Sequence, residues 1–329
     1  MQNTRLGWIV SGPIQASAAH SVQCNLICKD DNSVINKQLA RFWEIEEIEG
    51  LVHSSKNETF CENHFNKTTK RAEDGRFIVS IPLKESLHRL GESYKTAENR
   101  LMGIERKCKR NREFGERYHA FMREYLELGH MKKVVDTREG YYIPHHGVLN
   151  ENSATTKLRV VFDASCPTST GYSLNDCQVG PILQPDLFSA LIRFRKYAYE
   201  VTADIQKMYR ACLINPEQTK FQRILWRESE DSPVDTYELL TITYGTSSAS
   251  YLATRCLKQV SSECADPVIA DVINSHFYVD DLLTGANSLT EVTRLAKNVK
   301  IVLNGGGFNL HKWISNDPEI LRDVQGTQL

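Results

Sequence analysis

The sequence lacks the features that mark membrane-spanning, secreted and disulfide-bonded proteins. No apolar run in the 329 residues approaches the length of about 18 residues that a membrane-spanning helix needs. The opening segment MQNTRLGWIVSGPI holds one short apolar stretch without a basic segment before it, so we expect no signal peptide. The nine cysteines are odd in number and contain no CxxC spacing, which favours free thiols in a reducing compartment.

An excess of charge is also missing. The chain carries 40 basic and 41 acidic residues, so its net charge neither predicts nor excludes a nucleic-acid partner. The stretch ERKCKRNR (105–112) is the local exception and the most basic patch of the chain. A charge run usually forms a solvated face, but these residues are also candidate contacts for a phosphate backbone. The candidates are Arg106, Lys107, Lys109, Arg110 and Arg112.

Two groups of histidine or cysteine residues are candidates for metal or catalytic sites. Cys24, Cys28, Cys61 and His64 can be assembled into a zinc site, but their spacing matches no usual zinc motif. The adjacent pair at 145–146 is conspicuous, yet satisfied loop histidines are the favoured interpretation and no chemistry is assigned to His145 or His146.

Apolar periodicity and turn residues predict an α+β protein with helices on one face of a sheet. Two helical blocks within 84–129 are expected to pack together in one domain, since glycines interrupt the pattern that a coiled coil would need. A helix at 288–307 should begin at Ser288 or Thr290. Further predictions are strands within 74–83, 141–165 and 197–205, hairpins at 220–245 and 275–285, a helix at 246–262 and a strand at 308–316.

The first 75 residues show weak periodicity. Residues 1–14 read as a buried strand, LGWIVSG, that ends in a turn and has no partner before it, as at the tail of a missing domain. We interpret 15–75 as a linker with a short amphipathic helix near 37–49.

Two adjacent aspartates stand inside the apolar run HFYVDDLLTG (276–285). For Asp280 and Asp281 alone, ordinary turn chemistry is a strong alternative to a site. A third carboxylate, Asp204, ends the strand-like run EVTAD, and three carboxylates would converge if the two segments were neighbours in one sheet. Such oxygen ligands suit Mg²⁺, with Mn²⁺ as a substitute, and two ions about 4 Å apart can support phosphoryl or nucleotidyl transfer.

Several residues could serve a phosphorylated substrate beside these carboxylates. Lys157 and Arg159 lie on the strand TTKLRVVFD, where the alternative is a surface strand of alternating charge. Tyr209 could pack under a sugar ring or simply belong to the core, and Gly245 could allow close backbone approach or only form a turn. Lys312 could place an ammonium group near a leaving pyrophosphate.

Together these segments resemble the motifs of reverse transcriptases. FYVDD resembles the YxDD box, EVTADIQKMYRAC the first palm motif, and RVVFD the fingers motif that holds the incoming triphosphate. TYGTSSASYLA is similar to the motif that lies against template and nucleotide, and GGFNLHKW to the motif with the late palm lysine. The resemblance implies that Asp204, Asp280 and Asp281 hold two metal ions and that Tyr209 excludes a 2′-hydroxyl.

A narrower resemblance is to the Pol polyproteins of BEL/Pao long-terminal-repeat retrotransposons. It is carried by DGRFIVSIPL, YYIPHHGV, TTKLRVVFDAS and HKWISN in that order, and covers residues 1–316. LGWIVSG resembles the last strand of the aspartic protease that precedes the polymerase in that family. The chain departs from the family at Tyr244, where glutamine is common, and at Ala249-Ser250, where Ser-Pro is common.

The resemblance implies a right-hand polymerase whose antiparallel palm sheet is backed by helices, behind a poorly structured N-terminal segment. Fingers are expected over 76–196, a palm over 197–316 and a truncated tail over 317–329. The implied activity is RNA-directed DNA synthesis from deoxynucleoside triphosphates onto a primer 3′-hydroxyl, with primer–template and other Pol domains as partners and no membrane. The implied place is a cytoplasmic retrotransposon particle.

Two alternatives stay open at the level of sequence. The chain has no Asp-Thr-Gly or Asp-Ser-Gly protease site and stops soon after Lys312, before a thumb or a ribonuclease H. It could therefore be a nucleic-acid-binding Pol fragment with little or no turnover. It could also be another palm-type enzyme with paired aspartates, such as a nucleotide cyclase or a glycosyltransferase, which would not depend on a primer–template.

Overall fold

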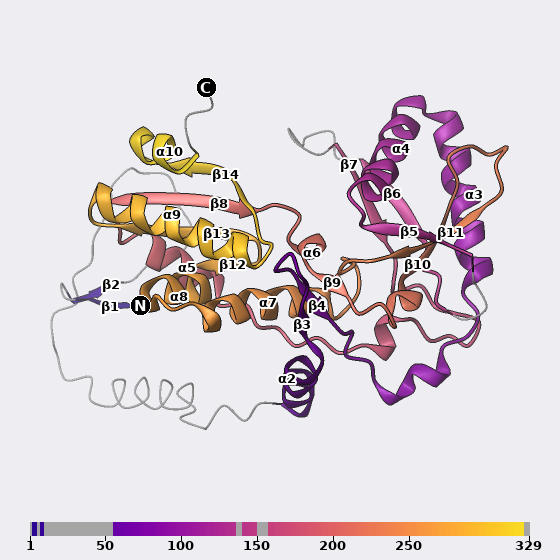
Figure 1. Ribbon diagram of the computed structural model, residues 1–329, viewed down its shortest axis with the longest axis horizontal. Helices are drawn as coiled ribbons and strands as arrows, with labels where there is room; N and C mark the ends of the chain where they lie inside the picture. Colours follow the sequence, from indigo (N-terminus) through magenta and orange to yellow (C-terminus); the bar gives the residue numbers. More distant parts are fainter. Residues whose placement is uncertain (1, 5–6, 10–54, 136–139, 150–156, 326–329) are drawn as a thin grey trace, which may run out of the picture. The chain divides into compact units, whose positions relative to one another are not determined.

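The computed structural model describes residues 2–4, 7–9, 55–135, 140–149 and 157–325 (Figure 1). The chain divides into two compact units, Met1–His53 and Ser54–Leu329, and each is described by itself. In the first unit, strands β1 (Gln2–Thr4) and β2 (Gly7–Ile9) pair antiparallel. The predicted strand in LGWIVSG is therefore present, but it has a partner, contrary to expectation. The helix expected near 37–49 lies outside the described residues.

The second unit contains a four-stranded antiparallel sheet that carries the three aspartates. Its strand order is β12 (Phe277–Tyr278), β13 (Asp281–Ala286), β8 (Tyr199–Ile205) and β14 (Leu310–Ser315). Along β8, Val201, Ala203 and Ile205 are buried, whereas the alternate residues Thr202 and Asp204 are only half-buried. This period of two gives the sheet one apolar face and one open face.

Three helices cover the apolar face of this sheet. The buried side chains between these helices and the sheet form the sheet core. The helices are α7 (Ala249–Glu263), α8 (Pro267–Ser275) and α9 (Leu289–Gly305). Figure 1 shows α9 lying along β8 and β13. The Ser288 side chain caps α9 by accepting from the Glu291 amide, as the sequence predicted. The unpredicted α8 begins with an Asp266 cap followed by proline, a common helix start.

A second, aromatic core lies between two helices and two small sheets. The helices are α3 (Tyr94–Arg110) and α4 (Arg112–Glu127), which pack together as predicted. Asn111 ends α3 and its side chain caps α4, which explains the break in helical phase seen in the sequence. The sheets are β6 (His145–Leu149) with β7 (Leu158–Phe162), and β10 (Arg223–Trp226), β11 (Asp235–Leu239) and β5 (Met131–Val134) in that order.

The predicted hairpin at 220–245 is present as β10 and β11. It packs, however, with elements outside the segment 197–316 to which it was expected to belong. Residues 197–316 were expected to form a palm around one core. Instead β11 pairs with β5, and Ile224, Trp226 and Leu239 are buried in the aromatic core with α3 and α4. The hairpin follows β8 in sequence but packs with elements that precede it.

The expected linker over 15–75 is wrong for its last twenty residues. Helix α2 (Lys56–Thr68) begins with a capping box, in which Ser55 and Glu58 exchange hydrogen bonds, and buries Cys61 and Phe65 in the sheet core. Strands β3 (Lys70–Arg71) and β4 (Phe77–Val79) follow it and join β9 (Leu213–Ile214) in one small sheet.

The remaining elements are short and complete the two cores. They are the 3₁₀ turns η1 (Glu85–Arg89), η2 (Asn175–Cys177) and η3 (Thr219–Gln222) and the helices α5 (Leu187–Phe194), α6 (Met208–Ala211) and α10 (Pro318–Gln325). The tail expected from 317 onward is thus helical over much of its length, with Ile320 and Val324 buried in the sheet core. Within the described ranges, no helix is both long and apolar enough to traverse a lipid bilayer.

Candidate active site

The three aspartates meet at one end of the four-stranded sheet. Asp281, the first residue of β13, is the direct partner of Asp204 on β8, and the Ile205 amide donates to the Asp280 carbonyl at 2.8 Å. The predicted neighbourhood of the two segments in one sheet is therefore present. The hydrophobic alternation of β8 fixes which of its faces is buried, and this excludes a slip of the register by one residue.

A two-residue turn, Val279-Asp280, joins β12 to β13 and presents the aspartate pair. Tyr278 pairs with Asp281 across the turn, and Val279 has a backbone φ of +57°. A positive φ at the first turn residue is the pattern of a type II′ hairpin turn. A β-branched residue is strained there, so this turn is held by the surrounding sheet rather than by its own residue preference.

Two cationic or potentially cationic side chains hold the Asp204 carboxylate. His311 Nε2 lies 2.9 Å from Asp204 Oδ1, and Lys312 Nζ donates to Asp204 Oδ2 at 3.0 Å. Neighbouring residues of a regular strand point to opposite faces, but the pairing of β14 with β8 shifts between His311 and Ile314, and Lys312 has a φ of +51°. This β-bulge turns two consecutive side chains toward one carboxylate.

The aspartates of the turn have perturbed acidity. Burial, assisted by the charge of Asp204, raises the pKa of Asp280, against the opposing effect of Lys312 and Arg159. Burial and then the charges of Asp280 and Asp204 raise the pKa of Asp281, and Lys312 again opposes the rise. Asp280 and Asp281 thus respond first to burial and then to the charge of Asp204, which lies within electrostatic reach of both.

A hollow of about 370 Å³ opens beside these groups on the uncovered face of the sheet. Asp204, Asp281 and Lys312 line it together with Tyr278, and apolar side chains of α5 and β14, Leu187 and Ile314, form its sides. The site therefore combines charged groups at one end with an apolar wall, as substrate sites commonly do.

The donor set suits magnesium in its chemistry. All three groups are carboxylates, the ligands that Mg²⁺ prefers, and a bound cation would offset the burial and the like charge that raise the pKa values of Asp280 and Asp281. Over the described ranges, however, no three His, Cys, Asp or Glu side chains are already gathered as a metal cluster. Asp204 is instead held by Lys312 and His311, and a metal ion at Asp204 would have to displace them.

Arg159 and Lys157 are placed differently with respect to the aspartates. Arg159 is exposed on β7, Lys157 is exposed just before that strand begins, and Arg159 is near enough to Asp280 to lower its pKa. Lys157 makes no hydrogen bond or ion pair within the part of the chain that the structure describes. Arg159 thus joins the electrostatic environment of the site, and Lys157 lies two residues before it.

Tyr209 lies close enough to Asp280 to respond to its charge. It lies on α6 and packs against the sheet core, and burial, assisted by the charge of Asp280, raises the pKa of its hydroxyl, whereas Ser250 lowers it. The Ser250 hydroxyl accepts from Gln184 Nε2 at 2.9 Å. Ser250 occupies a position where the resembling family commonly has proline, which has no hydroxyl to offer.

The conformation and packing of the backbone explain the glycine at Gly245, rather than the close approach of a ligand. Its φ is +95°, and a Cβ there would lie 2.2 Å from the Phe162 carbonyl oxygen. Asn175 ties the same loop, because its side chain donates to the Gly245 carbonyl at 3.0 Å and accepts from the Ser247 amide at 2.7 Å. Gly245 therefore locks the loop against the end of β7.

The basic stretch 105–112 is mostly engaged within the protein. Lys109 pairs with Glu230, Arg112 with Glu116 at 2.9 Å, and Arg106 Nε donates to the Met102 carbonyl at 3.2 Å. Lys107 turns inward toward β6, and Arg110 makes no ion pair with any described residue. These contacts leave the stretch less positive than its sequence suggests.

The other two candidate clusters behave as structural residues. His145 is buried between Tyr118 and the Leu225 carbonyl, where burial lowers its pKa to about 4, in line with a satisfied histidine. Of the zinc candidates, Cys61 points its thiol at the Val179 carbonyl, and burial raises the pKa of that thiol to about 11. His64 contacts the Ser80 carbonyl at 3.2 Å, and Cys24 and Cys28 lie outside the described residues.

Sequence reasoning missed two groups of the site, His311 and Ser250. His311 stands next to the predicted Lys312, so only the bulge, which periodicity does not reveal, separates it from an ordinary strand residue. Ser250 was noted as a departure from the family pattern, and its hydroxyl was the available signal.

Comparison with known proteins supports the fold. No protein-family model and no curated protein matches the sequence. The chain is similar to the foamy viral protease-reverse transcriptase in complex with RNA/DNA hybrid, with 14% identity and a TM-score of 0.51 over 89% of this chain and 34% of that chain. A prototype foamy virus protease-reverse transcriptase mutant aligns at 16% identity and a TM-score of 0.49, over 84% of this chain and 30% of that one.

The first of these similarities shows that the fold is the α+β fold of a reverse transcriptase's fingers and palm, as predicted. The chain spans about a third of the length of the viral protein, 34%.

Proposed function

We propose that this chain is the fingers and palm of an RNA-directed DNA polymerase from a BEL/Pao-type long-terminal-repeat retrotransposon. The observation that carries the proposal is the direct pairing of Asp204 with Asp281, with Asp280 at the adjoining turn and Lys312 on the Asp204 carboxylate. A fold alone does not define an activity, and this arrangement of carboxylates supplies the chemical argument. The retrotransposon assignment rests on the sequence motifs, and with it a place in a cytoplasmic particle beside other Pol domains.

In the proposed reaction Asp204, Asp280 and Asp281 hold two Mg²⁺ ions, or Mn²⁺ in their place. When bound, the ions activate the primer 3′-hydroxyl and neutralise the triphosphate. The protein's own groups position the substrates. Arg159 on β7 and Lys157 just before it bind the triphosphate of a deoxynucleotide, and Tyr209 lies against its sugar and excludes a 2′-hydroxyl.

Lys312 has two roles in this proposal. In the metal-free protein its ammonium group neutralises Asp204 at 3.0 Å and so limits the repulsion among the three carboxylates. If a metal ion were bound at Asp204, Lys312 would be free to turn toward the hollow that it lines, where its ammonium group would stabilise the leaving pyrophosphate.

One observation favours a second candidate, a nucleic-acid-binding fragment with little turnover. No metal cluster is preformed among the described side chains, and both Asp204 oxygens already have partners. If His311 and Lys312 kept the carboxylate, the chain would bind a primer–template without extending it.

The two candidates are separated by primer extension. Purified full-length chain is given a primed RNA template, deoxynucleoside triphosphates and Mg²⁺, beside the double variant Asp280→Asn, Asp281→Asn. Polymerase activity predicts Mg²⁺-dependent extension that the variant lacks. Equal traces from both proteins would remove the polymerase from this chain and leave the binding fragment. Incorporation without any primer–template would instead indicate another palm-type nucleotidyl transferase.

A further inference from the structure

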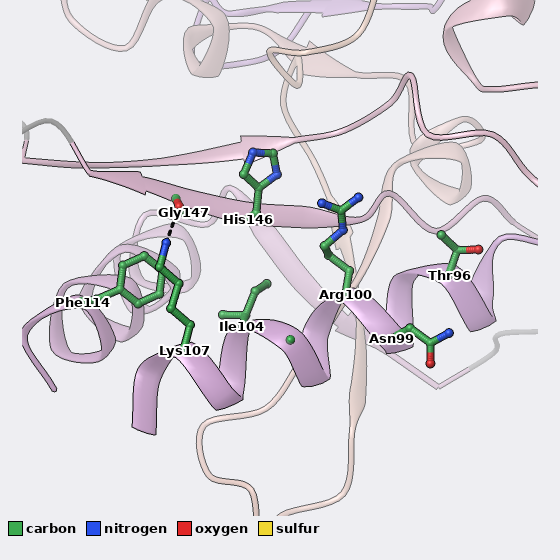
Figure 2. A pocket seen from close by; sticks show the side chains of 9 residues that line it. Thr96, Asn99, Arg100, Ile104, Lys107, Phe114, His146 and Gly147 are labelled. Carbon is green, nitrogen blue, oxygen red and sulfur yellow. Dashed lines mark hydrogen bonds between the residues drawn. The ribbon is translucent and has the colours of Figure 1, made fainter. Parts of the chain in front are cut away.

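A groove of about 470 Å³ runs along α3 where the helix passes β6, apart from the hollow at Asp204 (Figure 2). On one side it is lined by a stripe of α3 whose members recur every three or four residues, and therefore share one helix face. The stripe comprises Thr96, Asn99, Arg100, Gly103, Ile104 and Lys107. On the other side lie Phe114 of α4 and His146 and Gly147 of β6.

The charged side chains that line this α3–β6 groove are all positive. Its lining contains two cations, Arg100 and Lys107, and no carboxylate. The Arg100 side chain is 41% exposed and forms a long ion pair with Asp163, at 3.6 Å, which is not part of the lining. Figure 2 shows Arg100 and His146 extending in the same direction above the α3 stripe. The groove therefore attracts an anion.

Lys107 is placed so that it can exchange its partner. Its ammonium group donates to the Gly147 carbonyl at 3.4 Å, near the long limit of a hydrogen bond, and lies 4.2 Å from the centroid of the Phe114 ring. The ring holds the side chain in the groove whether or not the long hydrogen bond persists. A phosphate oxygen would replace a weak partner with a strong one.

The spacing of the two cations selects an extended ligand. Seven residues of helix separate Arg100 from Lys107, about 10.5 Å along the axis, which matches about three nucleotides of a stacked strand. Gly103 lies between them, and a Cβ placed on it would meet nothing within 4 Å, so the stripe is open at its middle. The floor beneath is apolar, formed by Ile104 and Phe114.

We propose that the α3–β6 groove binds the backbone of an unpaired nucleic-acid strand, with Arg100 and Lys107 as its phosphate contacts. This inference rests on the proposed polymerase function, in which that strand is the template beyond the primer end. It also narrows the earlier expectation for the basic stretch, because Lys107 alone of those five residues lines the groove.

The test compares two double variants with the same loss of charge. Arg100→Gln with Lys107→Met removes both cations of the groove and keeps an aliphatic side chain over Phe114. Lys109→Gln with Arg112→Gln is the control, on the same two helices but outside the groove. Fluorescence anisotropy measures binding of a labelled primer–template with an unpaired 5′ extension, and of a blunt duplex, at several salt concentrations without metal or nucleotide.

The groove variant is expected to bind the extended substrate roughly 10-fold more weakly at low salt and the blunt duplex unchanged. Its log–log salt slope should fall by about 1.4, since each lost phosphate contact on a single strand lowers the slope by about 0.7. The control should weaken both substrates slightly and equally. Equal losses on both substrates, or no loss on the extended one, would overturn the proposal.

A second variant keeps the test decisive if the first variant does not fold. Gly103→Glu adds a negative side chain at the open middle of the stripe, where space is free and where glutamate is the better helix former. It should fold at least as stably as the wild type and bind the extended substrate more weakly, whereas Gly103→Ala should bind normally. Normal binding by a folded Gly103→Glu protein contradicts the groove.

The result is separable from the fate of the polymerase proposal. Because binding is measured without metal or nucleotide, a chain that extends no primer can still show the groove's preference for an unpaired strand. Conversely, a chain that extends primers but binds both substrates equally keeps the polymerase proposal and loses the groove.

Discussion

Asp204 on β8 and Asp281 on β13 are direct partners in the antiparallel pairing of the two strands. Side chains at such positions share one face of the sheet and have Cβ atoms about 4.5–5.5 Å apart. The backbone ladder therefore holds two carboxylates together, and Asp280 joins them from the adjoining turn. Like charges placed in this way destabilise a sheet, and a bound cation would relieve their repulsion.

The first prediction concerns Asp280 and the pH dependence of stability. Burial and the charge of Asp204 raise its pKa above the ordinary 3.8, so the folded protein binds this proton more tightly than the unfolded chain does. The stabilising contribution is complete below 3.8 and is lost as the pH rises through the folded pKa. In EDTA at pH 7, Asp280→Asn should therefore raise the melting temperature, by roughly 1–2 °C.

Thermal unfolding between pH 4 and 7 checks this prediction. The advantage of Asp280→Asn should shrink as the pH falls toward 4, because the wild-type carboxyl then becomes protonated. Added Mg²⁺ should stabilise the wild type more than the variant, since a ligand that binds only the folded state raises its stability. A variant that melts below the wild type in EDTA at pH 7 contradicts the expected repulsion.

The second prediction concerns Lys312. Lys312→Met removes the cation from Asp204 and from the hollow, and should lower kcat for nucleotide incorporation about 100-fold with little change in the KM for nucleotide. Lys312→Arg, which keeps the charge, should retain part of the activity. Single-turnover incorporation measures both, and a rise in KM with unchanged kcat would place Lys312 in ground-state binding instead.

The third prediction concerns the sugar specificity expected from Tyr209. Ser250 lowers the pKa of Tyr209 and is itself fixed by Gln184 Nε2 at 2.9 Å, so Ser250→Ala should loosen the polar surroundings of the ring and reduce discrimination between deoxy- and ribonucleotides about fivefold. Ser262→Ala on the same helix, whose hydroxyl donates only to the Lys258 carbonyl, is the matched control.

Ratios of kcat/KM for the two nucleotide classes give the answer. Tyr209→Val should relax discrimination far more than Ser250→Ala does, and Gln184→Leu should resemble Ser250→Ala, because Gln184 donates to the Ser250 hydroxyl. If Ser250→Ala discriminates as the wild type does, packing alone holds Tyr209.

The fourth prediction separates two reasons for Gly245. Alanine there meets the Phe162 carbonyl at 2.2 Å in addition to an unfavourable φ of +95°, and should lower the free energy of unfolding by about 2–4 kcal/mol. Gly171→Ala is the control, because its φ is +83° but its Cβ would meet nothing within 4 Å, and about 1 kcal/mol is expected. Urea unfolding measures both, and equal losses would show that φ alone matters.

Much of the four-stranded sheet could be predicted because its signals are local. The run around Asp204 alternates with a period of two, so its strand followed from the sequence, whereas the convergence with Asp280 and Asp281 was conditional on the two segments being neighbours in one sheet. Helix α9 carries its own cap, Ser288. In each case the residues that form the element also identify it.

The remaining features depend on contacts between distant segments. Helix α2 is polar and buries only Cys61 and Phe65, so periodicity was weak, although the capping-box pattern Ser55 to Glu58 was there to be read. The β10–β11 hairpin was assigned to the wrong core because proximity in sequence does not specify which strand it joins. The pairing of His311 with Asp204, and the face of α3 that meets β6, likewise exist only in the folded chain.

Because of the bulge in β14, the geometry of the site depends on the number of residues in that strand. His311 and Lys312 both reach Asp204, and the next residue, Trp313, is buried in the sheet core. Deleting one residue here would restore regular alternation and turn either the lysine away from the carboxylate or the tryptophan out of the core. Through evolution, substitutions around Lys312 can therefore be absorbed one at a time, whereas a single-codon deletion between Leu310 and Trp313 removes either the lysine contact of the site or the packing beneath it.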